Sequence, residues 1–278
     1  MKTGMLAFVL AGAVAATGAQ AQSWEGSLEG GFFLTDRTST DTPIEDSPFL
    51  GTYFGGYASM NMGSLKFAID GRAEFTDDKG ADDVYVTGPL HTGVLGLRLG
   101  SQVSNTYFGA FAGAGWFDGY DSEDPMHGSI YGVEVEHFLG NGASVYAQLG
   151  RAKAIGDPGD NEFIGYDAKI GYLTPVNYRT TLNVSLESAY SPDCFEDCGA
   201  SQWGRYTTFG LEGTYSLTDR MDLVGAITYA KITANTEDDG KSTNVYLGIR
   251  VPFGAKPKSA LRTPMGAFHA AGWMAPLD

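Results

Sequence analysis

Alternation of apolar and polar residues recurs along this chain in segments of about ten residues, and it constrains the fold more than any other feature. The clearest segment covers residues 65–75. Its odd-numbered positions are apolar or small, and its even-numbered positions include Lys66, Asp70, Arg72 and Glu74. A period of two is that of a β-strand whose two faces meet different surroundings. The sequence therefore predicts an all-β protein.

Twelve segments of this kind follow one another along the chain. They cover 24–34, 50–60, 65–75, 85–100, 105–116, 128–138, 144–153, 163–173, 179–189, 206–215, 221–231 and 243–253. Pro89 disturbs the fourth segment, whose first half is assigned either to a strand or to a loop. The strand count would fall to ten if two of the glycine-rich segments were loops.

The connections between these segments alternate between long and short. The long connections hold 21 of the 33 acidic residues, whereas the short ones hold only Asp219. An antiparallel meander gathers the long connections at one end and the short ones at the other. Outer-membrane barrels have such ends, with short periplasmic turns and longer external loops. We therefore expect a transmembrane antiparallel up-and-down β-barrel of twelve strands.

The N-terminal residues predict export. Lys2 precedes an apolar run, and Ala19-Gln20-Ala21 supplies small residues for a signal peptidase, so residues 1–21 are predicted to be a signal peptide. The rest of the chain has 17 basic and 33 acidic side chains, a net charge of −16. Nucleic-acid binding requires a basic surface and is excluded on this ground. The expected location is the outer membrane of a Gram-negative bacterium, with residues 22–253 as the barrel domain.

The last segment carries a further signal. Residues 245–253 read Val-Tyr-Leu-Gly-Ile-Arg-Val-Pro-Phe, with alternating apolar residues and an aromatic end. Together with the leader, the even strand count and the sorted connections, this strand resembles the bacterial outer-membrane β-barrel, or small porin-like, families. In those families the barrel-assembly machinery reads such a strand. The resemblance implies that machinery, outer-membrane lipid and lipopolysaccharide as partners.

Residues 254–278 form a tail after the last strand, whereas the families named above normally end at the aromatic residue. An even number of strands returns the chain to its starting side, so both termini are expected in the periplasm. The tail carries Lys256, Lys258 and Arg262 among Pro, Gly and Ala residues. We expect a disordered periplasmic extension, and contact with peptidoglycan or a partner is the alternative.

Charged residues on the polar strand faces are expected to point into the barrel, because a charge that faces lipid near the midplane costs a few kcal/mol. The expected lumen residues are Glu25, Glu29, Lys66, Asp70, Arg72, Glu74, Arg98, Glu134, Glu136, Asp167, Lys169, Glu187, Glu212 and Arg250, nine acids and five bases. A water-filled lumen with this lining predicts a passive pore for small solutes with a weak cation preference.

Charges that pair across the lumen would plug it instead. That alternative is a non-conducting structural or surface-interaction barrel, whose acidic connections contact a host surface, lipopolysaccharide or divalent ions. Carboxylates for weak Ca²⁺ or Mg²⁺ contacts are present at Asp121, Glu123, Asp124, Asp157 and Asp160, but spaced acids are common in solvated loops and no metal site is predicted. Cys194 and Cys198 share one long connection and are candidates for a disulfide that closes a small ring.

A lipid-modifying enzyme embedded in the barrel is the third candidate. Such enzymes use Ser and His on the lipid-facing wall, and His137 shares the parity of the apolar Val133 and Val135. The only serine in that segment is Ser129, far from His137 along the strand, and no nucleophile motif is present. The sequence therefore predicts neither an enzyme nor a cofactor.

Overall fold

A computed structural model of the 278-residue chain describes residues 24–39, 49–76, 91–118, 126–155, 162–193, 204–234, 240–256, 259–266, 268 and 269. The predicted signal peptide, the acidic positions 121, 123, 124, 157 and 160, and both cysteines lie outside these described residues. Within the described part of the chain, no helix is long and apolar enough to cross a membrane.

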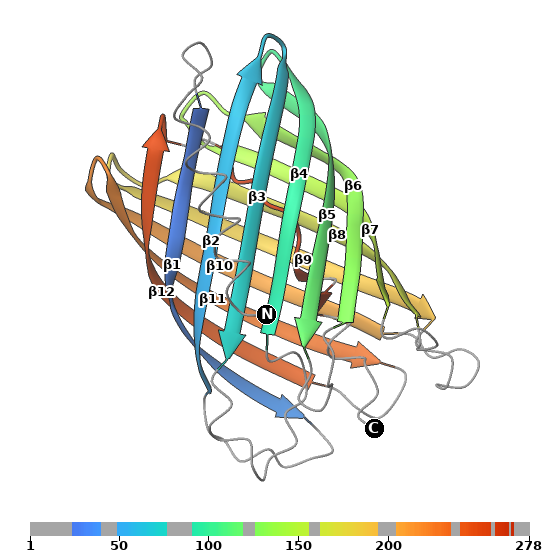
Figure 1. The fold of residues 1–278 in the computed structure, drawn as a ribbon. Coiled ribbons are helices and arrows are strands. Elements are labelled where there is room, and N and C mark those ends of the chain that lie inside the picture. The colour runs from blue at the N-terminus through green and yellow to red at the C-terminus, as the bar shows by residue number, and fades with distance from the viewer. Residues whose placement is uncertain are drawn as a thin grey trace, which may run out of the picture.

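Twelve β-strands form the wall (Figure 1). They are β1 (Trp24–Ser39), β2 (Phe49–Met62), β3 (Leu65–Thr76), β4 (His91–Val103), β5 (Thr106–Asp118), β6 (Met126–Phe138), β7 (Ser144–Ile155), β8 (Glu162–Pro175), β9 (Thr180–Asp193), β10 (Gly204–Thr218), β11 (Met221–Ala234) and β12 (Gly240–Gly254). Each strand pairs with the next, and β1 pairs antiparallel with β12 to close the ring. The predicted twelve-stranded antiparallel barrel is confirmed.

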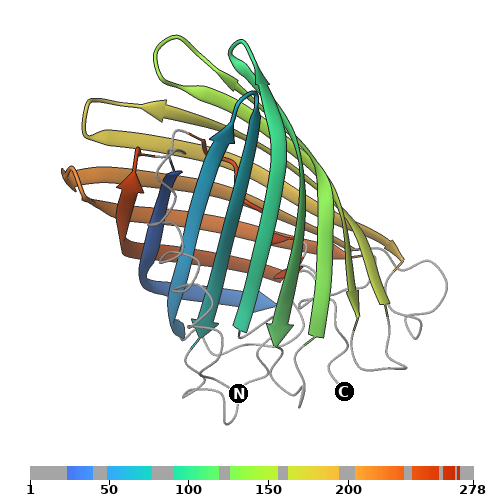
Figure 2. The ribbon, with the colours of Figure 1, turned by 45° about the horizontal axis from the view of Figure 1, so that its top comes forward.

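The two rims of the barrel differ. Turns of a few residues join β2 to β3, β4 to β5, β6 to β7, β8 to β9 and β10 to β11, and Figure 2 shows them together at one rim, here called the short-turn end. At the opposite rim, called the long-connection end, consecutive strand ends are separated in sequence by longer stretches that lie outside the described residues. The fourth strand begins at His91, so the stretch from 85 that the sequence offered as its first half lies outside the described residues.

The wall is apolar outside and charged inside. On β4, Leu97 and Leu99 are 49% and 52% exposed, whereas Arg98 between them is 3% exposed. Apolar side chains also point outward on other strands of the ring: Val133 on β6 and Leu247 on β12 are each 60% exposed. A soluble protein buries such apolar faces, and an outward apolar band is the arrangement of a barrel that lipid surrounds.

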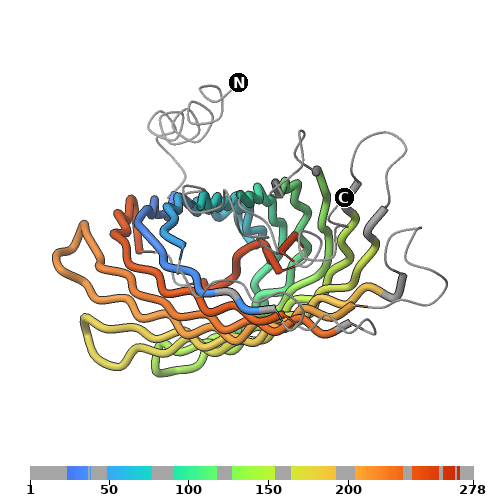
Figure 3. The backbone as a smooth tube through the Cα atoms, turned by 90° about the horizontal axis from the view of Figure 1, so that it is seen from below, coloured from blue at the N-terminus to red at the C-terminus, as the bar shows by residue number. Residues whose placement is uncertain are grey.

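The chain continues past β12 into the interior of the barrel. Residues 259–266, 268 and 269, here called the lumen segment, contact inward side chains of several strands. In the view along the barrel, this segment crosses the space inside the ring of strands (Figure 3). The sequence led us to expect a disordered extension outside the barrel. The structure instead places these residues within the lumen, where wall carboxylates accept their hydrogen bonds.

Candidate functional site

The turn from β12 into the lumen depends on Gly254. Its φ of +64° is a conformation that side chains other than glycine rarely adopt, and a Cβ there would lie 1.9 Å from the carbonyl oxygen of Trp24. Two residues later, Lys256 Nζ donates to Asp222 Oδ1 at 2.8 Å and to Ser216 Oγ at 2.9 Å. The chain is therefore fixed to the short-turn end before it enters the lumen.

Glu136 on β6 makes the first contact with the lumen segment. It accepts hydrogen bonds from Ser259 Oγ at 2.5 Å and from the main-chain N–H of Ala260 at 3.2 Å. Ser144 Oγ on β7 donates to the same carboxylate at 2.7 Å. Glu136 is fully buried, so these donors replace the water that its charge would otherwise hold.

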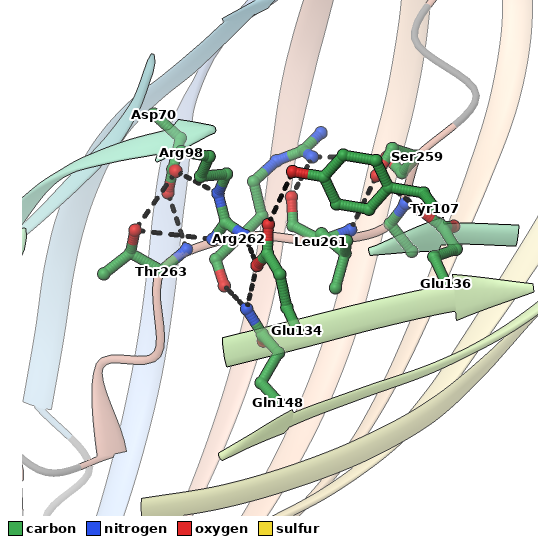
Figure 4. Close-up of polar contacts among 11 residues, drawn as sticks. Asp70, Arg98, Tyr107, Glu134, Glu136, Gln148, Ser259, Leu261, Arg262 and Thr263 are labelled. Carbon is green, nitrogen blue, oxygen red and sulfur yellow. Dashed lines mark hydrogen bonds and ion pairs between the residues drawn. The ribbon is translucent and has the colours of Figure 1, made fainter. Parts of the chain in front are cut away.

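Asp70 on β3 makes the second contact (Figure 4). Its carboxylate accepts from the N–H of Thr263 at 2.7 Å and from the Thr263 hydroxyl at 3.1 Å. Arg98 Nε donates to Asp70 Oδ1 at 2.8 Å, and Arg98 Nη1 also pairs with Glu134 on β6. One buried guanidinium thus joins two carboxylates on different strands.

Glu134 also contacts its neighbours in the wall. Tyr107 donates its hydroxyl to Glu134 at 3.1 Å, and Gln148 Nε2 donates to it at 3.0 Å (Figure 4). The same Gln148 nitrogen donates to the main-chain carbonyl of Arg262 at 3.0 Å. The wall therefore binds the lumen segment through carboxylates that accept hydrogen bonds and through at least one donor, the Gln148 amide nitrogen.

Glu187 on β9 makes the third contact. It accepts from the N–H of Gly266 at 2.6 Å and pairs with Lys169 Nζ at 2.9 Å. Asp167 is close to this group on β8 and is 2% exposed. Neither of its carboxylate oxygens has a hydrogen-bond partner among the described residues. In this part of the lumen, two neighbouring carboxyl groups share the single ammonium group of Lys169.

Apolar contacts accompany the hydrogen bonds. Leu261 is 2% exposed and packs against Tyr107 and Tyr146. Phe268 is 1% exposed and lies in a buried cluster with Val94, Phe111 and Ile130 among others. The guanidinium carbon of Arg262 lies 4.1 Å from the centroid of the Tyr57 ring, a cation–π contact.

A second group of charges lines the wall near the β1–β12 seam. Arg250 on β12 pairs with Glu29 at 2.6 Å and with Glu212 at 2.8 Å. Arg72 on β3 pairs with Glu74 at 2.8 Å, and its guanidinium also lies over the rings of Tyr53 and Tyr246. The Arg250 pairs join β12 to β1 and β10, and the ring contacts of Arg72 join β3 to β2 and β12.

The lumen segment ends beside this group. His269 Nε2 lies 3.7 Å from Glu74 Oε2, and the His269 ring contacts Tyr206. Glu74 is two residues from the end of β3 at the long-connection end. The described tail therefore runs from the short-turn end to the opposite end of the lumen, although the sequence led us to expect it on the starting side.

The predicted lumen residues all have inward contacts or are buried. Lys66 pairs with Glu25 at 2.8 Å near the short-turn end, and the other named residues form the groups described above. Sequence reasoning missed the partners that the tail supplies, above all Ser259, Thr263 and Phe268. The available signal was tail length: eleven extended residues can span roughly 35 Å, which exceeds the apolar band of about 25 Å.

His137 lies outside the lumen. Its side chain is exposed near the short-turn end of β6, and Nδ1 lies 2.8 Å from Thr106 Oγ1. Within the described residues, this imidazole has no carboxylate partner that would orient it, and no group of three His, Cys, Asp or Glu side chains is arranged to hold a metal. The described chemistry is therefore concentrated in the lumen, where charged groups hold a peptide segment.

Comparison with known proteins identifies the fold. No family model matches the chain, and no curated protein matches it. An outer membrane channel from Pseudomonas putida F1 is similar with a TM-score of 0.53 at 13% identity, over 84% of this chain and 97% of that one. OmpT, an outer membrane protein of Vibrio cholerae, gives 0.46 at 14% identity, over 84% and 99%. The KdgM porin gives 0.45 at 8%, over 82% and 99%.

The likeness to the Pseudomonas putida channel concerns the fold, because identity is low. The chain has the fold of outer-membrane β-barrels. The charged lumen and the segment that occupies it are described from the residues of this chain alone, and the comparison adds nothing about them.

Proposed function

We propose that this protein is an outer-membrane channel for small solutes that prefers cations and is closed, in the state described above, by its own lumen segment. The observation that carries the proposal is a charged lumen occupied by the segment of the chain that follows β12. The outward apolar band supports a location in lipid. Twelve strands enclose more space than the eight-stranded barrels that side chains alone can fill.

The cation preference follows from the lining. The inward wall residues predicted from the sequence are nine acids and five bases, the buried Asp222 on β11 adds a tenth acid, and the lumen segment adds Arg262. When the segment leaves, Glu136, Asp70 and Glu187 lose hydrogen-bond donors and face water. An open lumen would then favour cations over anions, because a narrow passage lined by carboxylates attracts cations and repels anions.

A non-conducting barrel is the second candidate. The observation that favours it is the number of charge pairs that cross the lumen, such as Arg98 with Asp70 and Glu134. In that case the lumen segment would be a permanent core, and function would belong to the long connections, through contact with lipopolysaccharide, divalent ions or another surface. An enzyme is the least favoured candidate, since the Thr106–His137 pair has no orienting group among the described residues.

A reversible disulfide between the wall and the lumen segment tests the proposal. A Cβ built at Gly96 lies 2.8 Å from the Cβ of Thr263, about 1 Å closer than in a typical disulfide, so a small shift would allow the bond. We would introduce Gly96→Cys and Thr263→Cys into the full chain with Cys194→Ser and Cys198→Ser, and record single-channel currents in a planar bilayer under a salt gradient.

We expect the oxidised protein to be silent and the reduced protein to show discrete, cation-preferring steps. Each single-cysteine variant serves as a control, because its currents should not respond to the redox change. Equal conductance before and after reduction would show that the segment does not close the channel. Silence in both states, with the barrel folded, would favour the non-conducting candidate.

A further inference from the structure

We propose that the lumen is a binding site for an extended peptide, uncharged or cationic and rich in N–H donors, and that the lumen segment is the occupant built into this chain. The ligand class is inferred from the way in which the wall holds that segment. This inference rests on the proposed function in one respect: the segment has to leave the lumen before another peptide enters.

Main-chain groups carry the recognition. The N–H groups of Ala260, Thr263 and Gly266, at intervals of three residues, donate to three carboxylates at 3.2, 2.7 and 2.6 Å. These acceptors are Glu136, Asp70 and Glu187, which lie on β6, β3 and β9. Every residue except proline has a main-chain N–H group, whatever its side chain. A second peptide in the same path would meet the same three acceptors.

The spacing of the carboxylates sets the ligand length. Six residue steps separate Ala260 from Gly266, and an extended chain covers at most about 20 Å in that number of steps. The apolar band of an outer-membrane barrel is about 25 Å tall. In the resident segment a helical turn begins at Met265, where the N–H groups of Phe268 and His269 donate to the Met265 carbonyl. A ligand of roughly seven residues in an extended path would therefore reach all three carboxylates.

The acidic lumen favours ligands that carry hydrogen-bond donors over ligands that carry acceptors. The Oε1 atom of Gln148 is a buried acceptor without a hydrogen-bond partner among the described residues, and the buried Asp167 adds a second carboxyl group beside Glu187. Gln148 contacts the lumen segment directly, and Asp167 lies in the group that binds Gly266. A ligand with additional N–H groups can satisfy such atoms, whereas an anionic ligand would bring further acceptors into an acidic lumen.

Two apolar anchors add side-chain selectivity. Leu261 packs between Tyr107 and Tyr146 at one end of the passage, and Phe268, seven positions later, packs in the buried cluster around Val94 at the other. Burial of a large apolar side chain stabilises a complex, because apolar surface is removed from water. We therefore expect tighter binding of peptides whose apolar residues have this spacing.

The test measures peptide binding to a full chain whose own segment is weakened. Leu261→Ala and Phe268→Ala remove both anchors and leave every wall residue unchanged. A fluorescent peptide with the sequence of residues 259–269, SALRTPMGAFH, is titrated into this variant in lipid nanodiscs, and anisotropy gives its Kd. We expect saturable binding, weakened about tenfold by Glu187→Gln, since a charged acceptor becomes neutral.

Methylated peptides separate main-chain recognition from other contacts. Methyl groups on the nitrogens that correspond to Ala260, Thr263 and Gly266 remove three donors, and we expect at least a hundredfold loss of affinity. The matched control carries one methyl group at Met265, whose N–H has no acceptor among the described residues, and should bind nearly as the parent does. Equal affinity of the parent and the triply methylated peptide would overturn the proposal.

Other outcomes are equally decisive. Binding of a neutral oligosaccharide but not of the peptide would replace the ligand class, and no peptide binding to a folded variant would reject the site. If the variant does not refold, the native full chain is titrated at higher peptide concentration, because the tethered segment competes at an effective concentration of about millimolar. Silence in both redox states of the disulfide test, together with intact peptide binding, would leave a peptide-binding barrel that does not conduct.

Discussion

Arg98 shows how much of the interior depends on single residues. Its side chain is 2% exposed and pairs with Asp70 and Glu134, carboxylates that stand 28 and 36 positions away along the chain. Two buried carboxylates without a cation would repel each other and would lack solvation. The arginine is therefore needed even though a buried ion pair by itself contributes little net stability.

We expect Arg98→Met to lower the free energy of unfolding by about 3–5 kcal/mol, because it leaves two buried carboxylates without their cation. Urea unfolding of the full chain in lipid vesicles measures this loss. Lys241→Met, an exposed position on β12, is the control and should change stability by less than about 0.5 kcal/mol. Asp70→Asn with Glu134→Gln should restore part of the loss. Unchanged unfolding in Arg98→Met would contradict this account.

Alternation within β4 was enough to assign Arg98 to the inner face, since parity follows from the strand itself. Its partners could not be predicted in the same way. The contact with Asp70 requires the register of β3 against β4, and the contact with Glu134 crosses β5 to reach β6. Register and strand stagger depend on closure of the whole ring, and no local pattern in the sequence specifies them.

The element that matters most is the lumen segment against β4. A Cβ at Gly96 would lie 1.8 Å from Thr263 Oγ1, while the nearest wall atom, Asp70 Oδ1, lies 3.2 Å away. A side chain at this position would therefore collide with the lumen segment, whereas the neighbouring wall atoms would leave space for it. A small substitution there acts on the segment selectively.

Gly96→Ala should displace the segment around Thr263 and leave the barrel folded. We expect more frequent channel opening and faster proteolysis of the tail, measured by single-channel recording and by mass spectrometry of released peptides. Gly31→Ala is an instructive control, since its Cβ would lie 2.2 Å from the main-chain oxygen of Leu247. That variant should lower barrel stability instead. A tail equally protected in Gly96→Ala and the native protein would refute the steric argument.

The strands were predictable and the lumen segment was not. Each of the twelve segments predicted from alternation corresponds to a strand, and residues 85–90 of the fourth segment lie outside the described residues. The tail has no hydrophobic period, and its contacts involve acceptors on β3, β6 and β9 that converge only after the barrel closes. A segment of small and polar residues without a period is usually disordered. Here the acidic lumen supplies the order.

At the scale of the whole molecule, the apolar exterior determines where the protein can reside. Leu97 lies near the middle of β4, and Val103 lies at its short-turn end. Both side chains point outward, with exposed fractions of 49% and 63%. In water these two positions would be equivalent, whereas in a bilayer they differ in depth.

Leu97→Arg should cost about 2–4 kcal/mol and Val103→Arg about 1 kcal/mol or less, because the cost of a charge on the lipid face falls with distance from the midplane. Equilibrium unfolding from lipid vesicles gives both values. The comparison between the two variants is its own control, since each places the same charge on the same face of the same strand. Equal costs would argue against a membrane around this barrel.

Within the described part of the chain, the lumen segment is joined to the wall through β12, just after Gly254, and no further strand follows it; this has a kinetic consequence. A loop inserted between two strands is held at both ends, so it can leave only by bending the wall. The lumen segment can leave the wall in reverse sequence order, so that the contacts of Phe268 and His269 break first and those of Ser259 break last. Each step breaks a few contacts and none of the hydrogen bonds between β1 and β12. The segment would then dissociate from the lumen stepwise, through partly dissociated intermediates. The ring of strands would remain closed throughout.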